Sequence, residues 1–286
     1  MTDFRPQILI LGCGYTGERV ARRLLAQGQR VVATSRQPEQ LADLQVAGAT
    51  ILPLDLAVLA TLSALENYIE PGCLVLHSIP PLKLPDGTLQ DHTPALLQAL
   101  GDKPSRMVYL STTAVYGSAK FVDEKTPAAP RNQREQVRVE AEQAVMAGPW
   151  RSLILRPAGI YGPGRNVAAS MLAGRYRLTG DGSNYVSRIH VDDLAAHCVA
   201  ALLQPDVCGA YPVADDLPAT SLEVASFCAE LLNLPVPASV TPEEAPPTRQ
   251  GDRRVDGCAI RASLGLTLAY PSYRQGIPAA LAPTPS

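Results

Sequence analysis

A glycine-rich turn between a buried strand and a helix, close to the N-terminus, constrains this chain more than any other feature. Residues 8–11 are four successive apolar residues, the pattern of a parallel strand that is buried on both faces. Gly12, Gly14 and Gly17 follow in the spacing Gly-x-Gly-x-x-Gly, and residues 18–27 have the periodicity of a helix. The spacing alone is weak evidence, but this strand–turn–helix context predicts a dinucleotide-binding turn.

Each glycine of this turn has its own physical reason. Gly12 permits the tight turn, Gly14 lets the backbone approach a pyrophosphate, and Gly17 lets the helix pack closely against the strand. The helix N-terminus offers free N–H groups and a positive dipole end to phosphates, so we expect Tyr15 and Thr16 to line the cofactor site as well. An ordinary tight turn between a strand and a helix is the alternative interpretation.

Composition excludes several classes of function. The formal net charge of -2 over 286 residues gives no electrostatic footprint for nucleic acid. No apolar run has membrane-spanning length, and the first strand begins without a preceding signal peptide. Six scattered cysteines without a Cys-x-x-Cys pair indicate neither a disulfide framework nor a zinc or other metal site. We therefore expect a cytoplasmic protein with a small-molecule partner.

The end of the second strand bears on the choice of cofactor. Residues 30–34 form the expected strand, and Ser35 and Arg36 follow it. A fold that selects NAD usually has an acidic residue at this point to bond the ribose 2′-hydroxyl, and none stands between Val31 and Arg36. A guanidinium fork and a serine hydroxyl suit the 2′-phosphate of NADP, so NADP is favoured. NAD as the cofactor, with Arg36 a solvated surface residue, is the alternative.

Two further strands are expected to end at the same crevice. They span residues 50–54 and 73–78, and the carboxyl ends of such strands face the cofactor in a doubly wound sheet. His77, in the strand expected over residues 73–78, is interpreted as a structural residue. Residues 80–93 are predicted to form a loop, and Thr93 is predicted to cap the helix that follows. The residues expected to contact the cofactor at these strand ends are Asp55, Leu56, Ser78 and Ile79.

A family resemblance becomes specific after the strand at residues 106–110. The segment Ser-Thr-Thr-Ala-Val-Tyr-Gly follows directly, and four later stretches fit the same pattern in order. The chain resembles a short-chain dehydrogenase/reductase of the extended or atypical type, akin to the NAD-dependent epimerase/dehydratase proteins. The matching stretches are 111–117, 155–164, 188–195, 211–214 and 264–273.

The resemblance implies an α/β fold, a doubly wound parallel sheet (Rossmann) with a small C-terminal substrate lobe. Residues 1–165, completed by 187–216, are expected to form the dinucleotide-binding domain. Residues 166–186 and 217–286 are expected to form the substrate lobe, with a surface connection over 234–247. The resemblance also implies that Pro157 contacts the cofactor and that the substrate contacts are Tyr161, Arg165, Arg188 and His190.

The catalytic pair of the family, Tyr-x-x-x-Lys, is absent. Counting back from Glu142, the Lys position falls on Arg138 and the Tyr position on Arg134, and no tyrosine stands between Tyr116 and Tyr161. Arg138 keeps a donor and a charge for the nicotinamide ribose. Arg134 cannot replace the tyrosine because a guanidinium does not release its proton near neutral pH. In the alternative interpretation, Arg134, Arg138 and Glu142 form a charged, solvated helix face.

The remaining candidates for chemistry follow the fifth strand. Thr112 matches the family's Ser/Thr position and is expected to orient a substrate carbonyl. Tyr116 and Tyr161 are the nearest phenols, and either is a candidate substitute acid. A tyrosine in Val-Tyr-Gly is otherwise a packing residue, so these catalytic assignments are hypotheses.

Three functions are compatible with these patterns. The first is an NAD(P)-binding oxidoreductase that favours NADP and acts on a small organic substrate with a non-standard acid. The second is a nucleotide-sugar epimerase or dehydratase, against which the missing pair counts. The third is a regulatory module that senses NADP without turnover, which the missing pair favours. A homodimer is compatible with the sequence, and the substrate is left open.

Overall fold

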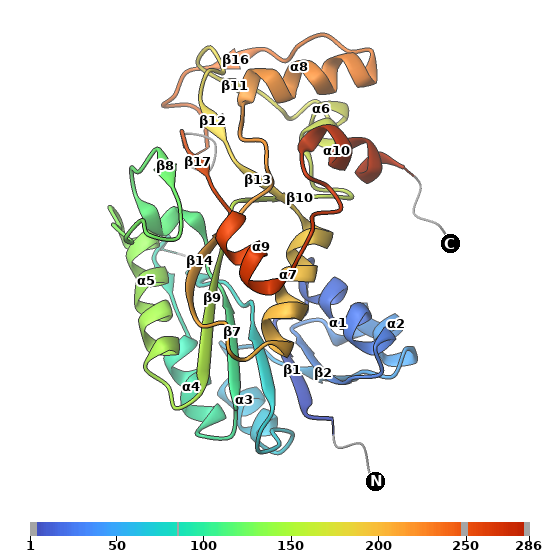
Figure 1. The fold of residues 1–286 in the computed structure, drawn as a ribbon, viewed down its shortest axis with the longest axis vertical. Helices are drawn as coiled ribbons and strands as arrows, with labels where there is room; N and C mark the ends of the chain where they lie inside the picture. Colours follow the sequence, from blue (N-terminus) through green and yellow to red (C-terminus); the bar gives the residue numbers. More distant parts are fainter. Residues whose placement is uncertain (1–4, 85, 247–250, 283–286) are drawn as a thin grey trace.

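The computed structural model describes residues 5–84, 86–246 and 251–282, and a parallel sheet forms its centre (Figure 1). In the described residues this sheet has seven strands in the order β14-β9-β7-β4-β1-β2-β3, with every neighbouring pair parallel. The order reverses between β1 and β4, which is where ligands bind in open α/β sheets. The strands are β1 Gln7–Leu11, β2 Arg30–Ser35, β3 Thr50–Pro53, β4 Leu74–His77, β7 Arg106–Leu110, β9 Arg151–Pro157 and β14 Gly209–Val213. The predicted doubly wound fold is confirmed.

Helices cover both faces of the sheet, and this explains the unbroken apolar strands. Along β1, Ile8 and Ile10 enter one core cluster while Leu9 and Leu11 enter another. Successive side chains of a strand point to opposite faces, so a strand covered on both sides is apolar throughout. The first cluster is covered by α1 (Gly17–Ala26), α2 (Ala42–Val46), α7 (Val191–Leu203) and α9 (Cys258–Leu264). The second is covered by α3 (Leu59–Glu66), α4 (Thr93–Leu100) and α5 (Gln133–Met146).

A third core cluster lies beyond the carboxyl ends of the strands, at the upper end of the view in Figure 1. It packs α6 (Val167–Leu172), α8 (Ser221–Leu232) and α10 (Tyr273–Leu281) around buried Tyr161 and Tyr273. Short strand pairs surround it: β10 (Gly159–Tyr161) with β13 (Arg188–His190), β11 (Leu178–Thr179) with β16 (Ser239–Val240), and β12 (Tyr185–Val186) with β15 (Ala219–Thr220). The division into two domains at the boundaries given above stays a prediction.

Two more strand pairs complete the described fold. The segment after β4 forms a hairpin of β5 (Leu82–Lys83) and β6 (Leu89–Gln90), where the sequence had predicted only a loop. The other pair joins β8 (Phe121–Val122) to β17 (Arg254–Val255) in parallel. No helix in the described ranges is both long and apolar enough to span a bilayer.

Three local predictions need comment. Thr93 was expected to cap α4, but it lies inside the helix, where Asp91 Oδ1 accepts its backbone N–H at 2.7 Å. The Thr93 hydroxyl instead bonds His77 Nε2 at 2.9 Å, because both side chains are buried and need a partner. Of the segment 187–216, β14 joins the main sheet, whereas β13 pairs with β10. Pro247, the end of the predicted surface connection, lies outside the described residues.

Candidate functional site

The glycine turn is built around a backbone that accepts no side chain at Gly12. Its φ is +83°, and a Cβ there would lie 2.8 Å from Ile79 Cγ1 and 3.1 Å from the Ile79 backbone nitrogen. Gly12 donates its N–H to Thr34 Oγ1 at 3.1 Å, and Ser78 Oγ donates to the Gly12 carbonyl at 2.7 Å. Ser78 and Ile79 therefore hold the turn from the end of β4, at the point where the strand order reverses.

Gly14 and Gly17 have different surroundings. A Cβ at Gly17 would lie 3.0 Å from the Gly12 carbonyl oxygen, so this glycine lets α1 begin close to the turn. A Cβ at Gly14 would meet nothing within 4 Å, and the residue is exposed. The open space over Gly14 is the cradle that a pyrophosphate fills at such turns, beside the N-terminus of α1. Thr16 stands at the N-cap position of that helix.

The other residues predicted to contact the cofactor lie along the same edge of the sheet. Arg36 is exposed just after β2, next to Ser35, whose Oγ accepts the Gln37 N–H at 3.0 Å. Asp55 and the partly buried Leu56 follow β3. Pro157, likewise predicted, is the last residue of β9.

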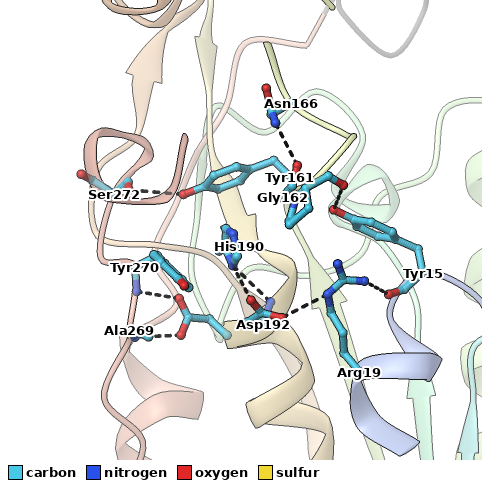
Figure 2. Close-up of polar contacts among 12 residues, drawn as sticks. Tyr15, Arg19, Tyr161, Gly162, Asn166, His190, Asp192, Ala269, Tyr270 and Ser272 are labelled. Carbon is cyan, nitrogen blue, oxygen red and sulfur yellow. Dashed lines mark hydrogen bonds and ion pairs between the residues drawn. The ribbon is translucent and has the colours of Figure 1, made fainter. Parts of the chain in front are cut away.

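Tyr15 and Arg19 join the glycine turn to the segments beyond the sheet (Figure 2). The Tyr15 hydroxyl donates to the Pro163 carbonyl at 3.0 Å, and the Arg165 guanidinium carbon lies 5.6 Å from the Tyr15 ring centroid. Arg19 donates to the Tyr15 carbonyl at 2.7 Å and pairs with Asp192 Oδ1 of α7 at 3.1 Å. Burial raises the pKa of Tyr15, although the positive charges of Arg19 and Arg165 act to lower it. The turn is thus tied to the segment that carries Arg165.

Thr112 and Tyr116 lie at opposite ends of the short 3₁₀ helix η2 (Thr113–Tyr116), directly after β7. Thr112 Oγ1 accepts the Ala114 N–H at 3.2 Å, which leaves the hydroxyl proton available to another acceptor. Tyr116 is 1% exposed, and the Arg156 guanidinium carbon lies 4.9 Å from its ring centroid. Burial raises the pKa of Tyr116, so the phenol is held neutral within the core.

The two predicted counterparts of the catalytic pair both lie in α5 but have different surroundings. Arg134 is exposed in the first turn of the helix, whereas Arg138 is half-buried and donates to Tyr109 Oη at 2.6 Å. Tyr109 belongs to β7 and is paired in register with His77 of β4, so Arg138 points to the ends of these two strands. Burial raises the pKa of Tyr109 to about 12 and lowers that of His77 to about 3. His77 is buried and bonded to Thr93, which fits the structural interpretation.

Glu142 contradicts the interpretation of this helix as a solvated charged face. It is 1% exposed and forms an ion pair with Arg156 of β9, with Nη2 and Oε2 2.6 Å apart. Ser111 Oγ also donates to the Glu142 carboxylate. The carboxylate can be buried because Arg156 of β9 and Ser111, directly after β7, supply donors for it. A helical spacing pattern does not reveal these partners.

Tyr161 and His190, both predicted to contact substrate, are packed against each other with ring centroids 5.2 Å apart (Figure 2). The Tyr161 hydroxyl donates to the Ser272 carbonyl at 3.2 Å, and burial raises its pKa. His190 Nδ1 accepts the Asp192 N–H at 3.2 Å and caps α7, and burial lowers the pKa of the imidazole. Both side chains are buried, and the Tyr161 hydroxyl is already donated to a backbone carbonyl.

An arginine-lined pocket of about 320 Å³ lies against β10, β12, β13 and α6. Arg165 and Arg188 were predicted from the sequence, and the fold adds Arg177 to them. Arg188 is almost wholly buried and donates to the Val186 carbonyl at 2.7 Å, and burial lowers the pKa of its guanidinium. Among the described residues that line the pocket there is no carboxylate. Neutral polar side chains also line it: Tyr161, Asn166, Ser170, Tyr176, Thr179 and Ser221.

Asp215 is a buried carboxyl group beside this region. It stands two residues after the end of β14, is 2% exposed, and its Oδ2 has no hydrogen-bond partner among the described residues. Burial raises its pKa to about 8, although Arg188 opposes the shift. Asp215 also lines a separate cavity of about 490 Å³ with three other aspartates. In the described part of the chain, no cluster of three or more residues suits a metal ion.

The family model described as "NAD dependent epimerase/dehydratase family" matches residues 8–213, which include the whole glycine turn and, apart from Gln7, all seven strands of the central sheet. The chain belongs to this family. Its members bind a nicotinamide dinucleotide, and the open cradle at Gly14 between two crowded glycines fits that group. The predicted family and its NAD(P)-binding, oxidoreductase-like function are confirmed.

Reductases are among the similar proteins. The chain is 28% identical to a 3-diazoavenalumate denitrifying reductase from a Streptomyces species, over 95% of this chain and 99% of that protein. It is 31% identical to a 2-alkyl-3-oxoalkanoate reductase from Stenotrophomonas maltophilia, over 66% of this chain and 63% of that protein. Among solved structures, a functionally unknown conserved protein from Silicibacter pomeroyi is 33% identical with a TM-score of 0.78, covering 96% of this chain and 98% of that one.

Proposed function

We propose that this protein is an NADP-dependent reductase of a small oxo compound that carries an acidic group. The observation that carries the proposal is the arginine-lined pocket, which adjoins the glycine turn through Arg165 and Tyr15 and contains no carboxylate among its described lining residues. Guanidinium groups suit carboxylates and phosphates because their donors match two oxygens at once. The relative named for a 3-oxoalkanoate supports a carboxylate as the acidic group.

The cofactor would be held along the carboxyl edge of the sheet. The backbone at Gly14 and the N-terminus of α1 suit the pyrophosphate, and Ser35 with Arg36 suits a 2′-phosphate. Arg138, half-buried near the ends of β4 and β7, suits a ribose hydroxyl. When bound, the reduced nicotinamide supplies the hydride.

The substrate would span from the arginine-lined pocket to Thr112. Arg165 and Arg188 would bind the acidic group, and the Thr112 hydroxyl would donate to the oxo group that accepts the hydride. This donation is available because Thr112 Oγ1 already accepts the Ala114 N–H and keeps its proton for another partner. The hydride would go to the oxo carbon, and water would supply the proton of the product alcohol. Tyr116 and Tyr161 are not assigned a proton transfer, since both phenols are buried and their pKa values are raised.

The test compares acids with their esters. Reduction of a series of 3-oxo carboxylates and of the matching methyl esters is followed by the loss of NADPH absorbance. The proposal predicts turnover of the acids, with KM at least roughly tenfold lower than for the esters, as expected for a lost charge-assisted contact. Arg165→Ala should remove most of that difference. Equal KM values for acids and esters would contradict the acidic substrate, and tight NADPH binding without any turnover would support the regulatory module instead.

A further inference from the structure

The side chain of Arg253 binds three backbone carbonyls of the loop that follows β7. Its Nε donates to the Ala119 carbonyl at 2.9 Å, and its two terminal nitrogens donate to the carbonyls of Thr113 and Gly117. The guanidinium is half-buried, and burial lowers its pKa. Among the described residues it forms no ion pair with a carboxylate, so its donors serve the loop backbone.

This loop needs such a donor. The carbonyls at the end of a short 3₁₀ helix have no partner within the helix; η2 ends at Tyr116, and Gly117 follows it with a φ of +59°. A Cβ at Gly117 would lie 2.1 Å from the Ala129 carbonyl oxygen, so the chain turns sharply in close contact with a neighbouring segment. One planar guanidinium can satisfy several carbonyls at once, which an ammonium group cannot do in the same geometry.

The backbone of Arg253 is fixed to the other part of the site. Its N–H donates to the Tyr185 carbonyl at 2.8 Å, and its carbonyl accepts Ser187 Oγ at 3.3 Å. These partners flank Val186 and precede Arg188, and both of those residues line the arginine-lined pocket. Arg253 therefore lies between that pocket and the loop that carries Thr112.

We infer that Arg253 is a positioning residue, which fixes the Thr112 hydroxyl relative to the arginine-lined pocket. It thereby sets the distance between the acidic group of the substrate and the oxo group that is reduced. This inference rests on the proposed function. Among the described residues, Arg253 forms no hydrogen bond or ion pair with the glycine turn or with the three arginines of the pocket. Its loss should therefore leave cofactor and acid binding largely intact while the loop at Thr112 moves.

The inference predicts a separation of kinetic constants. Arg253→Ala should lower kcat for reduction of 3-oxobutanoate by roughly tenfold to a hundredfold, the range for a lost hydrogen-bonding side chain of this charge. The KM for 3-oxobutanoate and the dissociation constant for NADPH should each change by less than about threefold. Ethylguanidinium added at millimolar concentration should restore part of the kcat of Arg253→Ala, whereas ethylammonium should not.

Arg254→Ala is the matched control. It removes the same charge from the next residue, whose guanidinium lies over the rings of Tyr185 and Phe121 instead of the loop. Arg253→Lys provides a second variant if the alanine variant does not fold. It should lower kcat and not respond to ethylguanidinium.

A second measurement does not depend on the substrate. Backbone hydrogen exchange over residues 113–119 should accelerate in both Arg253 variants and stay unchanged in Arg254→Ala, while exchange over 8–17 stays unchanged in all. A wild type that reduces no oxo acid would refute the proposed function, and the exchange data would still test the contact. Unchanged exchange over 113–119, an unchanged kcat, or an equal loss of kcat in Arg254→Ala would overturn the role of Arg253.

Discussion

Arg156 and Glu142 form a buried ion pair directly behind the loop that bears Thr112. Arg156 Nη2 lies 2.6 Å from Glu142 Oε2, and the two side chains are 9% and 1% exposed. Ser111, the neighbour of Thr112, donates to the same carboxylate. The Glu142 carboxylate thus joins helix α5 to strand β9 and to the residue after β7. These contacts hold the start of the loop that bears Thr112 in place.

Glu142→Gln should strongly destabilise the protein. The substitution leaves the Arg156 charge buried without a counter-charge, which costs about 3–5 kcal/mol of the free energy of unfolding. Urea denaturation of wild type and variant measures this difference. Glu140→Gln is the control, because Glu140 is exposed on the same helix and, among the described residues, its side chain accepts only from Gln136. A loss in Glu142→Gln no larger than in the control would show that the pair does not stabilise the fold.

Asp215 should make the protein less stable as the pH rises. Burial raises its pKa to about 8 in the folded chain, while an unfolded aspartate titrates near pH 3.9. Between these values the folded state binds a proton that the unfolded state does not. The free energy of unfolding should therefore fall by up to about 1.4 kcal/mol for each pH unit through this window.

Asp215→Asn should remove this slope. Urea denaturation at several pH values compares it with Asp216→Asn, which alters the adjacent exposed carboxylate that pairs with Arg261. The wild type and Asp216→Asn should lose stability from about pH 5 to about pH 8 more steeply than Asp215→Asn does. Parallel curves for all three proteins would refute the raised pKa of Asp215.

Arg138→Ala should weaken the binding of NADPH. A charge-assisted contact to the ribose contributes about 1.5–3 kcal/mol, so the dissociation constant should rise roughly tenfold to a hundredfold. Arg134→Ala removes an equal charge from an exposed position one turn earlier and should leave the affinity within about twofold. Fluorescence titration of NADPH measures both. Equal effects of the two variants would assign Arg138 to the solvated helix surface.

Arg36→Ala should reduce the preference for NADP over NAD. The exposed guanidinium after β2 is available to a 2′-phosphate and to nothing equivalent in NAD. The affinity for NADPH should fall roughly tenfold or more, and the affinity for NADH should stay the same. Competition titrations of both nucleotides decide this. If the wild type binds the two equally well, Arg36 has no part in the selection.

The sheet was predictable because its strands carry the evidence locally. Continuous apolar runs such as residues 8–11 require cover on both faces, and parallel strands end at one edge. The places of Gly12, Ser78 and Thr112 at that edge follow from this geometry alone. The predicted boundaries of the first five strands agree with the structure to within about one residue, because the apolar runs themselves mark where these strands begin and end.

The contacts between distant segments were not predictable. The helical spacing around Glu142 predicts a solvated side chain, because its partner Arg156 belongs to a later strand and gives no signal within the helix. Arg253 gives no local signal either, because its three carbonyl acceptors lie 134, 136 and 140 residues earlier. Arg177 joins Arg165 and Arg188 only once the short strand pairs have formed. The roles of such residues become visible only in the tertiary structure, because no spacing pattern in the sequence indicates them.

The affinity of Gly14→Val for NADPH measures whether the glycine turn holds the cofactor. A Cβ at position 14 meets nothing within 4 Å in the folded chain, so the variant should unfold at the same urea concentration as the wild type. Gly251→Val is the control, since Gly251 has equally open surroundings outside the turn. We predict that Gly251→Val binds NADPH like the wild type, while Gly14→Val loses at least about a hundredfold in affinity because the valine fills the phosphate cradle. A folded Gly14→Val protein that binds NADPH as tightly as the wild type would contradict the account.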